Sequence, residues 1–213
     1  MVEGAIRNEE ACDAWHQAVE KWLSVAAIFD ESLERSIADG FSKVPREHFF
    51  SATGFVEQHE DALVSIGDGE FLFRPTILMR MCALIEARKR KRVLVAGAGS
   101  GYLCAVLDAI GVQVFGVERI ISMAQATRKN LDRLGHHAVW IQSGDAAKGW
   151  SDAAPFDAIV CCYPIEEADE LPIAELVDGG LIVAPLACVD GLRLALWEQG
   201  DGVLQRTVFE RID

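Results

Sequence analysis

Apolar residues near the N-terminus recur at the spacing of two amphipathic helices. One side of a 3.6-residue period is formed by Trp15, Val19, Trp22 and Ala26. Asp30, a residue type that caps helix N-termini, precedes a second apolar side made of Leu33, Ile37 and Phe41. Because exposed apolar faces are unfavourable in water, we expect both helices to pack on the rest of the chain.

A third helix is predicted after a turn-rich stretch that includes Gly67 and Gly69. Pro75 stands where a helix favours its first residue. The apolar face that follows consists of Ile77, Leu78, Met81, Leu84 and Ile85. We therefore expect this helix to begin at Pro75.

From residue 92 onward, apolar runs alternate with helix-length segments. The predicted strands are Arg92–Ala96, Gln113–Glu118, Ala138–Gln142, Phe156–Cys162, Leu181–Leu186, Leu192–Glu198 and a last one near Gln205–Ile212. The run Val93–Ala96 has no polar alternation, which is typical of a central parallel strand covered on both faces. The predicted helices include Leu103–Ile110 and Ile120–Leu134, the latter followed by Gly135 in the place of a left-handed cap. Strands joined by helical crossovers predict an α/β fold with a parallel, Rossmann-like sheet.

Composition and charge restrict the class of protein. The 213 residues are 51% hydrophobic and 25% charged, which fits one compact globular domain. The net charge of −13 argues against nucleic acid as a partner, since phosphate binding needs a basic face. The basic run at residues 88–92 is interpreted as a solvated link between a helix end and a strand. No segment reaches the roughly 18 uninterrupted apolar residues of a membrane span, and we expect a soluble, cytoplasmic protein.

The cysteines show no metal-ligand spacing and no CxxC pair, so no metal site is predicted. They are Cys12, Cys82, Cys104, Cys161, Cys162 and Cys188. The neighbouring Cys161 and Cys162 admit two interpretations, a redox-active pair or core residues of a strand in a reducing cytosol. We favour the second, because most of the cysteines lie in apolar stretches where a free thiol behaves as a small hydrophobe. The loop that these two residues begin, Cys161–Pro164, is expected to cross the mouth of any site at this edge of the sheet.

A glycine-rich loop, Gly97–Tyr102, lies between the first parallel strand and the helix after it. Glycines there let the backbone turn sharply and let a ligand approach closely. A dinucleotide fingerprint, G-x-G-x-x-G, has its third glycine where this chain has Tyr102. The spacing G-x-G-x-G is instead typical of S-adenosylmethionine enzymes. A nucleotide-binding oxidoreductase stays open as a less favoured alternative.

Two acidic residues follow at the ends of the next two predicted strands. Glu118 comes 21 positions after Gly97, where a carboxylate can accept hydrogen bonds from both ribose hydroxyls. Its alternative interpretation is an ordinary exposed acid paired with Arg119. Asp145 is placed to accept from an adenine amino group. Because carboxyl ends of parallel strands meet at one edge of a sheet, we expect one nucleoside site there. Asp157 is expected to bond neighbouring backbone and to have no catalytic role.

Several segments together resemble the protein-L-isoaspartate O-methyltransferase family, from about Val44 to the last strand. They are Val44-Pro45-Arg46-Glu47, Ile66-Gly67-Asp68-Gly69 with Pro75, Gly97-x-Gly99-Ser100-Gly101-Tyr102, Val117-Glu118-Arg119, Gly144-Asp145, Pro155–Ile159 and Gly179-Gly180. The first two are not general methyltransferase features, so the combination is specific.

The resemblance implies a class I S-adenosylmethionine-dependent methyltransferase fold with an N-terminal helical segment. Residues 1–75 would form the N-terminal helices and the substrate-side segment, and residues 76–213 the Rossmann-like core. The implied reaction methylates the free carboxylate of an isoaspartyl residue in a protein or peptide, which starts repair, with S-adenosyl-L-methionine as cofactor. The implied cofactor-binding residues are Gly97, Ala98, Gly99, Ser100, Gly101, Glu118, Arg119, Asp145 and Ala146. Gly67, Gly69, Phe73 and Arg74 are expected on the substrate side, and no residue is assigned a catalytic role.

The chain departs from the family pattern at two places. The family segment Gln-Thr-Ile-Ser-Gln-Pro reads Glu-Phe-Leu-Phe-Arg-Pro here, so Phe71 replaces a threonine and Phe73 the serine that faces the acceptor. Val95 stands where the family has Asp or Glu near the methionine end of the cofactor. Losing a charged acceptor near an ammonium is expected to cost about 1.5–3 kcal/mol, about tenfold or more in affinity.

These departures leave alternatives open. Arg74 is either a bidentate clamp for a carboxylate or a surface arginine at a helix start. The chain as a whole is either a carboxyl methyltransferase with a changed acceptor pocket, or a weak or inactive relative that serves as a binding or scaffold module.

Overall fold

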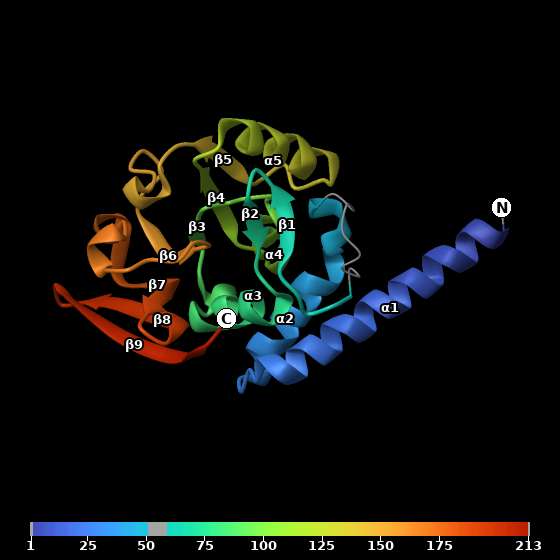
Figure 1. The fold of residues 1–213 in the computed structure, drawn as a ribbon, viewed down its shortest axis with the longest axis horizontal. Coiled ribbons are helices and arrows are strands. Elements are labelled where there is room, and N and C mark those ends of the chain that lie inside the picture. The colour runs from blue at the N-terminus through green and yellow to red at the C-terminus, as the bar shows by residue number, and fades with distance from the viewer. Residues whose placement is uncertain (1, 51–58, 213) are drawn as a thin grey trace.

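A seven-stranded sheet lies at the centre of the computed structural model, which describes residues 2–50 and 59–212, with side chains from residue 13 onward. Its strand order is β5-β4-β3-β6-β7-β8-β9 (Figure 1). The strands are β3 Arg92–Ala96, β4 Gln113–Glu118, β5 Trp140–Ser143, β6 Phe156–Cys161, β7 Leu176–Cys188, β8 Gly191–Gly200 and β9 Val203–Arg211. The strands β3, β4, β5, β6 and β7 are parallel to one another, whereas β8 and β9 are antiparallel to their neighbours. The predicted α/β fold with a parallel sheet is confirmed.

One strand of the sheet, β7, begins earlier than the predicted strand Leu181–Leu186. β7 already begins at Leu176, which pairs with Phe156, and the pairing resumes with Leu181 opposite Ala158. The residues between form an irregularity in the strand, and Gly179 takes a φ of +73° there. A glycine can adopt this backbone without strain, so the strand continues through a bulge at these residues.

The α-helices from residue 75 onward are α3 Pro75–Leu84, α4 Tyr102–Ile110 and α5 Ile121–Arg133, and the 3₁₀ turns are η1 Arg46–Phe49, η2 Ala87–Lys89, η3 Ala146–Lys148, η4 Ala168–Glu170 and η5 Ile173–Glu175. Helices α4 and α5 connect parallel strands of the sheet, and α3 precedes its first strand, β3. The helix start at Pro75 is confirmed, and Gly135 has the predicted left-handed φ of +90° after α5. β3 is the central strand expected from its apolar run, since residues 93–96 are fully buried.

The two N-terminal helices are α1 Val2–Ala26 and α2 Glu31–Lys43. Asp30 caps α2 as predicted, because its carboxylate accepts from the backbone N–H groups of Ser32 and Leu33 at 2.9 Å. The predicted apolar sides are buried except at Leu33, which is partly buried. Trp22, Phe41 and Val95 belong to one continuous core. The first turns of α1 run outward from the rest of the chain (Figure 1). The predicted division of the chain into an N-terminal part, residues 1–75, and a core, residues 76–213, stays a prediction.

A separate β-hairpin lies between η1 and α3, in the stretch where the sequence indicated only turns. Its strands are β1 Val64–Gly67 and β2 Glu70–Leu72, which pair antiparallel. Strands this short offer too few alternating positions to be recognised from their pattern. The segment before them is fixed by Asp61, whose carboxylate accepts from Thr76 N at 2.9 Å and Thr76 Oγ1 at 2.7 Å, at the start of α3.

Two interpretations of charged residues are confirmed. Residues 88–92 link η2 to the start of β3. Asp157 bonds backbone, since its Oδ2 accepts from the N–H groups of Lys91 and Arg92 at 2.8 Å each. No helix in the described part of the chain is both long and apolar enough to cross a membrane.

Thiol reactivity is expected to follow burial. Burial raises the pKa of Cys82, of Cys104 and of Cys161 to about 12, since desolvation disfavours the thiolate. Only the thiolate attacks alkylating reagents, so these three thiols should resist iodoacetamide in the folded protein at neutral pH. Cys188, which is partly exposed, should react sooner. Mass spectrometry of peptides labelled before and after unfolding checks this. Rapid labelling of Cys161 in the folded protein would support the redox-active alternative instead.

Candidate cofactor site

The glycine-rich loop connects β3 to α4 through a left-handed backbone. Gly97, Gly99 and Gly101 have φ values of +79°, +54° and +87°. The N–H groups of Gly97 and Ala98 both donate to the carbonyl of Val117 at 2.9 Å, which ties the loop to β4. Side chains at these glycines would be strained whatever the space around them, so the loop requires glycine for its conformation.

Glu118 holds this loop from the neighbouring strand. Its side chain is only 4% exposed. One carboxylate oxygen, Oε2, accepts from Gly99 N at 2.9 Å, and the other, Oε1, accepts from Ile120 N at 2.9 Å. An ionised carboxylate has about four lone-pair sites, so each oxygen can accept one further hydrogen bond from a ligand. The alternative of an exposed acid paired with Arg119 is not what the structure shows.

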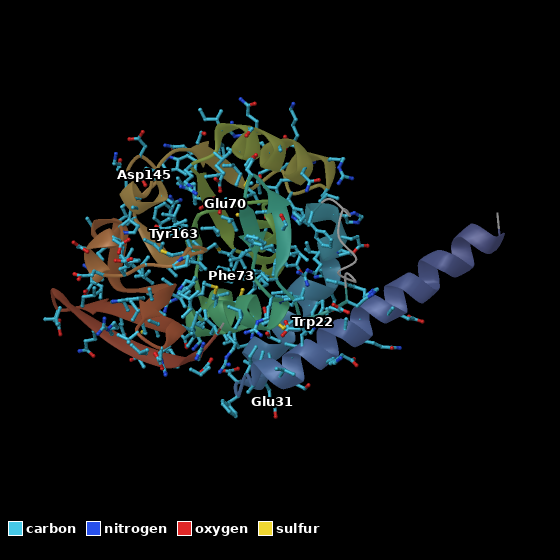
Figure 2. All side chains as sticks on the ribbon, viewed as in Figure 1. Trp22, Glu31, Glu70, Phe73, Asp145 and Tyr163 are labelled. Carbon is cyan, nitrogen blue, oxygen red and sulfur yellow. The ribbon has the colours of Figure 1, made fainter. Side chains whose placement is uncertain are left out.

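A cavity of about 360 Å³ opens at the carboxyl edge of β3, β4 and β6. It is lined by Glu70, Gly97, Glu118, Arg119, Asp145, Ala146, Ala147, Cys162, Tyr163 and Pro164. This volume lies within the range of small-molecule sites in proteins. The predicted loop glycine, ribose carboxylate and adenine carboxylate therefore meet at one cavity. Figure 2 shows Asp145, Tyr163 and Glu70 on this side of the sheet.

The other predicted cofactor residues take different places. Ala98 is buried, with 6% of its surface exposed, and Gly101 is the N-cap of α4. Ser100 lies at a second, smaller cavity of about 220 Å³ beside η1 and α5. Asp145 caps η3, since its Oδ1 accepts from Ala147 N at 3.1 Å. The cofactor role of all these residues stays a prediction.

The loop after β6 reaches the cavity through Cys162, Tyr163 and Pro164, as expected for the segment that crosses its mouth. The Tyr163 ring lies against the glycine loop, because a Cβ on Gly97 would come within 3.1 Å of Tyr163 Cδ1. Burial raises the pKa of Tyr163 and of Cys162, so both side chains stay neutral at physiological pH. This wall of the cavity carries no charge.

Glu70 is a cavity residue that the sequence did not reveal. It begins β2, and its Oε1 lies 2.6 Å from Nη2 of Arg119. This carboxylate raises the pKa of the Arg119 guanidinium through a hydrogen bond and its charge. Glu70 stands where the family segment has a glutamine. Its partner Arg119 is 49 residues away in the sequence, so the pair can be found only in the folded chain.

The predicted substrate-side residues lie on and after the hairpin. Gly67 and Gly69 form its turn, with φ values of +97° and +79°. Phe73 is partly buried and packs against the main core. Arg74 Nη2 donates to the carbonyl of Ile212 at 2.6 Å, so its guanidinium contacts backbone of the C-terminal segment. Its use as a carboxylate clamp stays a prediction.

Val95 places no charge near the cavity. It is fully buried in the middle of β3, opposite Gly116 on one side and Val160 on the other. The acids at the cavity wall are therefore Glu70, Glu118 and Asp145, all of which come from other elements.

Comparison with known proteins identifies the family. The family model described as Protein-L-isoaspartate(D-aspartate) O-methyltransferase matches residues 28–208. The chain is 32% identical over 176 residues to a protein-L-isoaspartate O-methyltransferase of Pelodictyon phaeoclathratiforme, covering 82% of this chain and 80% of the relative. It is 37% identical over 176 residues to protein-L-isoaspartate O-methyltransferase 2 of Marinobacter nauticus, covering 80% of each.

Solved structures show the same fold. One protein-L-isoaspartate O-methyltransferase aligns with a TM-score of 0.77 at 23% identity, over 91% of this chain and 64% of that one. A putative protein-L-isoaspartate O-methyltransferase of Plasmodium falciparum, solved with S-adenosyl-L-homocysteine, aligns with a TM-score of 0.76 at 18% identity, over 93% and 98% of the two chains. The predicted class I methyltransferase fold is thereby confirmed. The chain belongs to the protein-L-isoaspartate(D-aspartate) O-methyltransferase family of S-adenosylmethionine-dependent methyltransferases, as its motifs predicted.

Proposed function

We propose that this protein transfers the methyl group of S-adenosylmethionine to the free carboxylate of an isoaspartyl residue in a protein or peptide. The observation that carries the proposal is the cavity where Gly97, Glu118 and Asp145 meet, in a chain of this family. The names of the relatives support the acceptor.

The residues around the cavity fit the cofactor. Glu118 is held in place by two backbone N–H groups and keeps acceptor sites for the ribose hydroxyls. Asp145 is the proposed acceptor for the adenine amino group. Gly97 lines the cavity, and the Tyr163 ring that packs against it forms the neighbouring uncharged wall.

The reaction makes modest chemical demands on the chain. S-adenosylmethionine, when bound, supplies a methyl group activated by a sulfonium. The acceptor carboxylate is ionised at neutral pH, because an ordinary carboxyl has a pKa of about 4, so it needs no general base. The protein has to hold the acceptor oxygen in line with the methyl group, and orientation supplies most of the rate effect. The fixed contacts of Glu118 with the glycine loop would hold the cofactor in one position, so that the acceptor has to be aligned against it.

The acceptor side is more apolar than the family pattern. Phe71 is 54% exposed on β2, and Phe73 follows the same strand. Both rings stand where hydroxyl groups are usual. We infer an acceptor pocket that favours apolar residues beside the isoaspartyl group, because an aromatic surface stabilises apolar contacts and offers no hydroxyl donor.

A second candidate function is a weak or inactive relative that binds without catalysis. Val95 favours it, since a fully buried apolar residue replaces the acid near the methionine end of the cofactor. Calorimetry with S-adenosylhomocysteine, followed by transfer of a labelled methyl group to isoaspartyl peptides, separates the two functions. Binding with transfer is the expected result. Binding without transfer would indicate the binding module, and no binding at millimolar ligand would reject the cofactor.

We also infer a cytoplasmic location. The supporting observation is that Cys82, Cys104 and Cys161 are free thiols buried in the core. Free thiols persist in reducing compartments, whereas oxidising compartments favour disulfides.

A further inference from the structure

An ion pair joins two separate parts of the fold at the wall of the cofactor cavity. Glu70 belongs to the hairpin, and Arg119 directly follows β4 and the ribose-side carboxylate of Glu118. Their charged atoms are 2.6 Å apart, and both residues line the cavity. The contact therefore lies where the hairpin meets the nucleoside half of the site.

The hairpin pairs with no strand of the central sheet in the described part of the chain. Its two strands form a sheet of their own, apart from the central sheet. Ile66 of β1 packs against the glycine loop. Its Cδ1 is so close to Gly99 that a Cβ added to this glycine would lie 3.0 Å from it. The hairpin thus covers the loop at Ile66, and Glu70 joins it to Arg119, the residue after β4. A ligand held between the loop and β4 is partly enclosed by this arrangement.

We propose that Glu70 and Arg119 are positioning residues that keep the hairpin closed over the cofactor cavity and thereby slow release of the cofactor. This inference rests on the proposed function, because it takes S-adenosylmethionine or its product as the occupant. Opening of the hairpin separates the two charges, so the energy of the pair is part of the barrier to release.

The size of the effect follows from exposure. The side chain of Arg119 is 75% exposed and that of Glu70 is 36% exposed. Exposed ion pairs are weak and are screened by salt, so the pair should change the release rate by about two- to fivefold. Faster release at high salt is a second consequence.

Release of S-adenosylhomocysteine, measured by stopped-flow displacement, tests the proposal. This ligand has no net charge at neutral pH, so changes in overall cavity charge affect it little. Glu70→Gln should release it about two- to fivefold faster than the parent at low salt. The exchange Glu70→Arg with Arg119→Glu should restore slow release, because the pair is rebuilt with its charges reversed. Raising salt from about 0.05 M to about 0.5 M should speed release from the parent but not from Glu70→Gln.

Asp39→Asn is the matched control. Asp39 forms an ion pair of the same length, 2.6 Å, with Lys43 on α2, and its removal changes the net charge equally. This variant should release the ligand at the parental rate. Parental release from Glu70→Gln, or fast release from the exchanged variant, would overturn the positioning role while leaving the proposed function standing. If the parent binds no S-adenosylhomocysteine, the proposed function fails and the positioning role fails with it.

Discussion

Replacing Glu118 by alanine should lower the affinity for S-adenosylhomocysteine about 100-fold or more. The carboxylate accepts from Gly99 N and Ile120 N and is proposed to accept from the ribose hydroxyls. Hydrogen bonds to a charged group contribute about 1.5–3 kcal/mol each, and two lost ribose contacts amount to about 3–6 kcal/mol. The replacement also removes the bond from Gly99 N, whereas the bonds from Gly97 N and Ala98 N to the Val117 carbonyl stay. Isothermal titration calorimetry measures the affinity directly.

Two further variants make this prediction specific. Glu118→Gln keeps the volume of the side chain but turns one acceptor oxygen into a donor, so its affinity should lie between the parent and Glu118→Ala. Glu198→Ala removes an exposed carboxylate on β8 and should bind like the parent. Affinity of a folded Glu118→Ala within about threefold of the parent would contradict the ribose role.

Replacing Arg46 by methionine should destabilise the protein by about 3 kcal/mol or more. Arg46 is fully buried, and its guanidinium donates to the carbonyls of Glu60 at 2.8 Å and Ala62 at 2.9 Å. Each bond from a charged group contributes about 1.5–3 kcal/mol, and methionine leaves both carbonyls without this partner. Burial lowers the pKa of Arg46, since desolvation disfavours its charged form. Urea denaturation should show the loss as a lower midpoint.

The same side chain offers a test of geometry. Arg46→Lys keeps the charge but cannot reproduce the planar fork that reaches both carbonyls, so it should recover only part of the lost stability. Arg35→Met, on the exposed side of α2, is the surface control and should leave the midpoint nearly unchanged. An unchanged midpoint for Arg46→Met would show that the segment before the hairpin is held by other contacts.

The sequence predicted those parts of the fold where one local pattern determines the structure. The apolar run before Gly97 identified a buried central strand, and Asp30, Pro75 and Gly135 each marked a helix end. The hairpin was missed because its strands are too short for a pattern, and the start of β7 was missed because Gly179 suits a bulge as well as a turn.

The site was predictable to the extent that it follows chain order. Gly97, Glu118 and Asp145 lie at or just after the carboxyl ends of parallel strands, so topology alone brings them to one edge. The ion pair of Glu70 with Arg119 and the buried guanidinium of Arg46 depend on how the hairpin folds back on the sheet. Their partners are distant in sequence, and nothing in the spacing of the residues indicates them.

The most direct test of the proposed activity is methyl transfer from labelled S-adenosylmethionine to a synthetic isoaspartyl peptide. The same peptide with an ordinary aspartyl residue serves as the matched acceptor control. We predict a base-labile methyl ester on the isoaspartyl peptide alone, with better turnover when an apolar residue stands beside the isoaspartyl group. A protein that binds S-adenosylhomocysteine but methylates neither peptide would contradict the assignment and leave the Gly97–Glu118 site as a binding site without this catalysis.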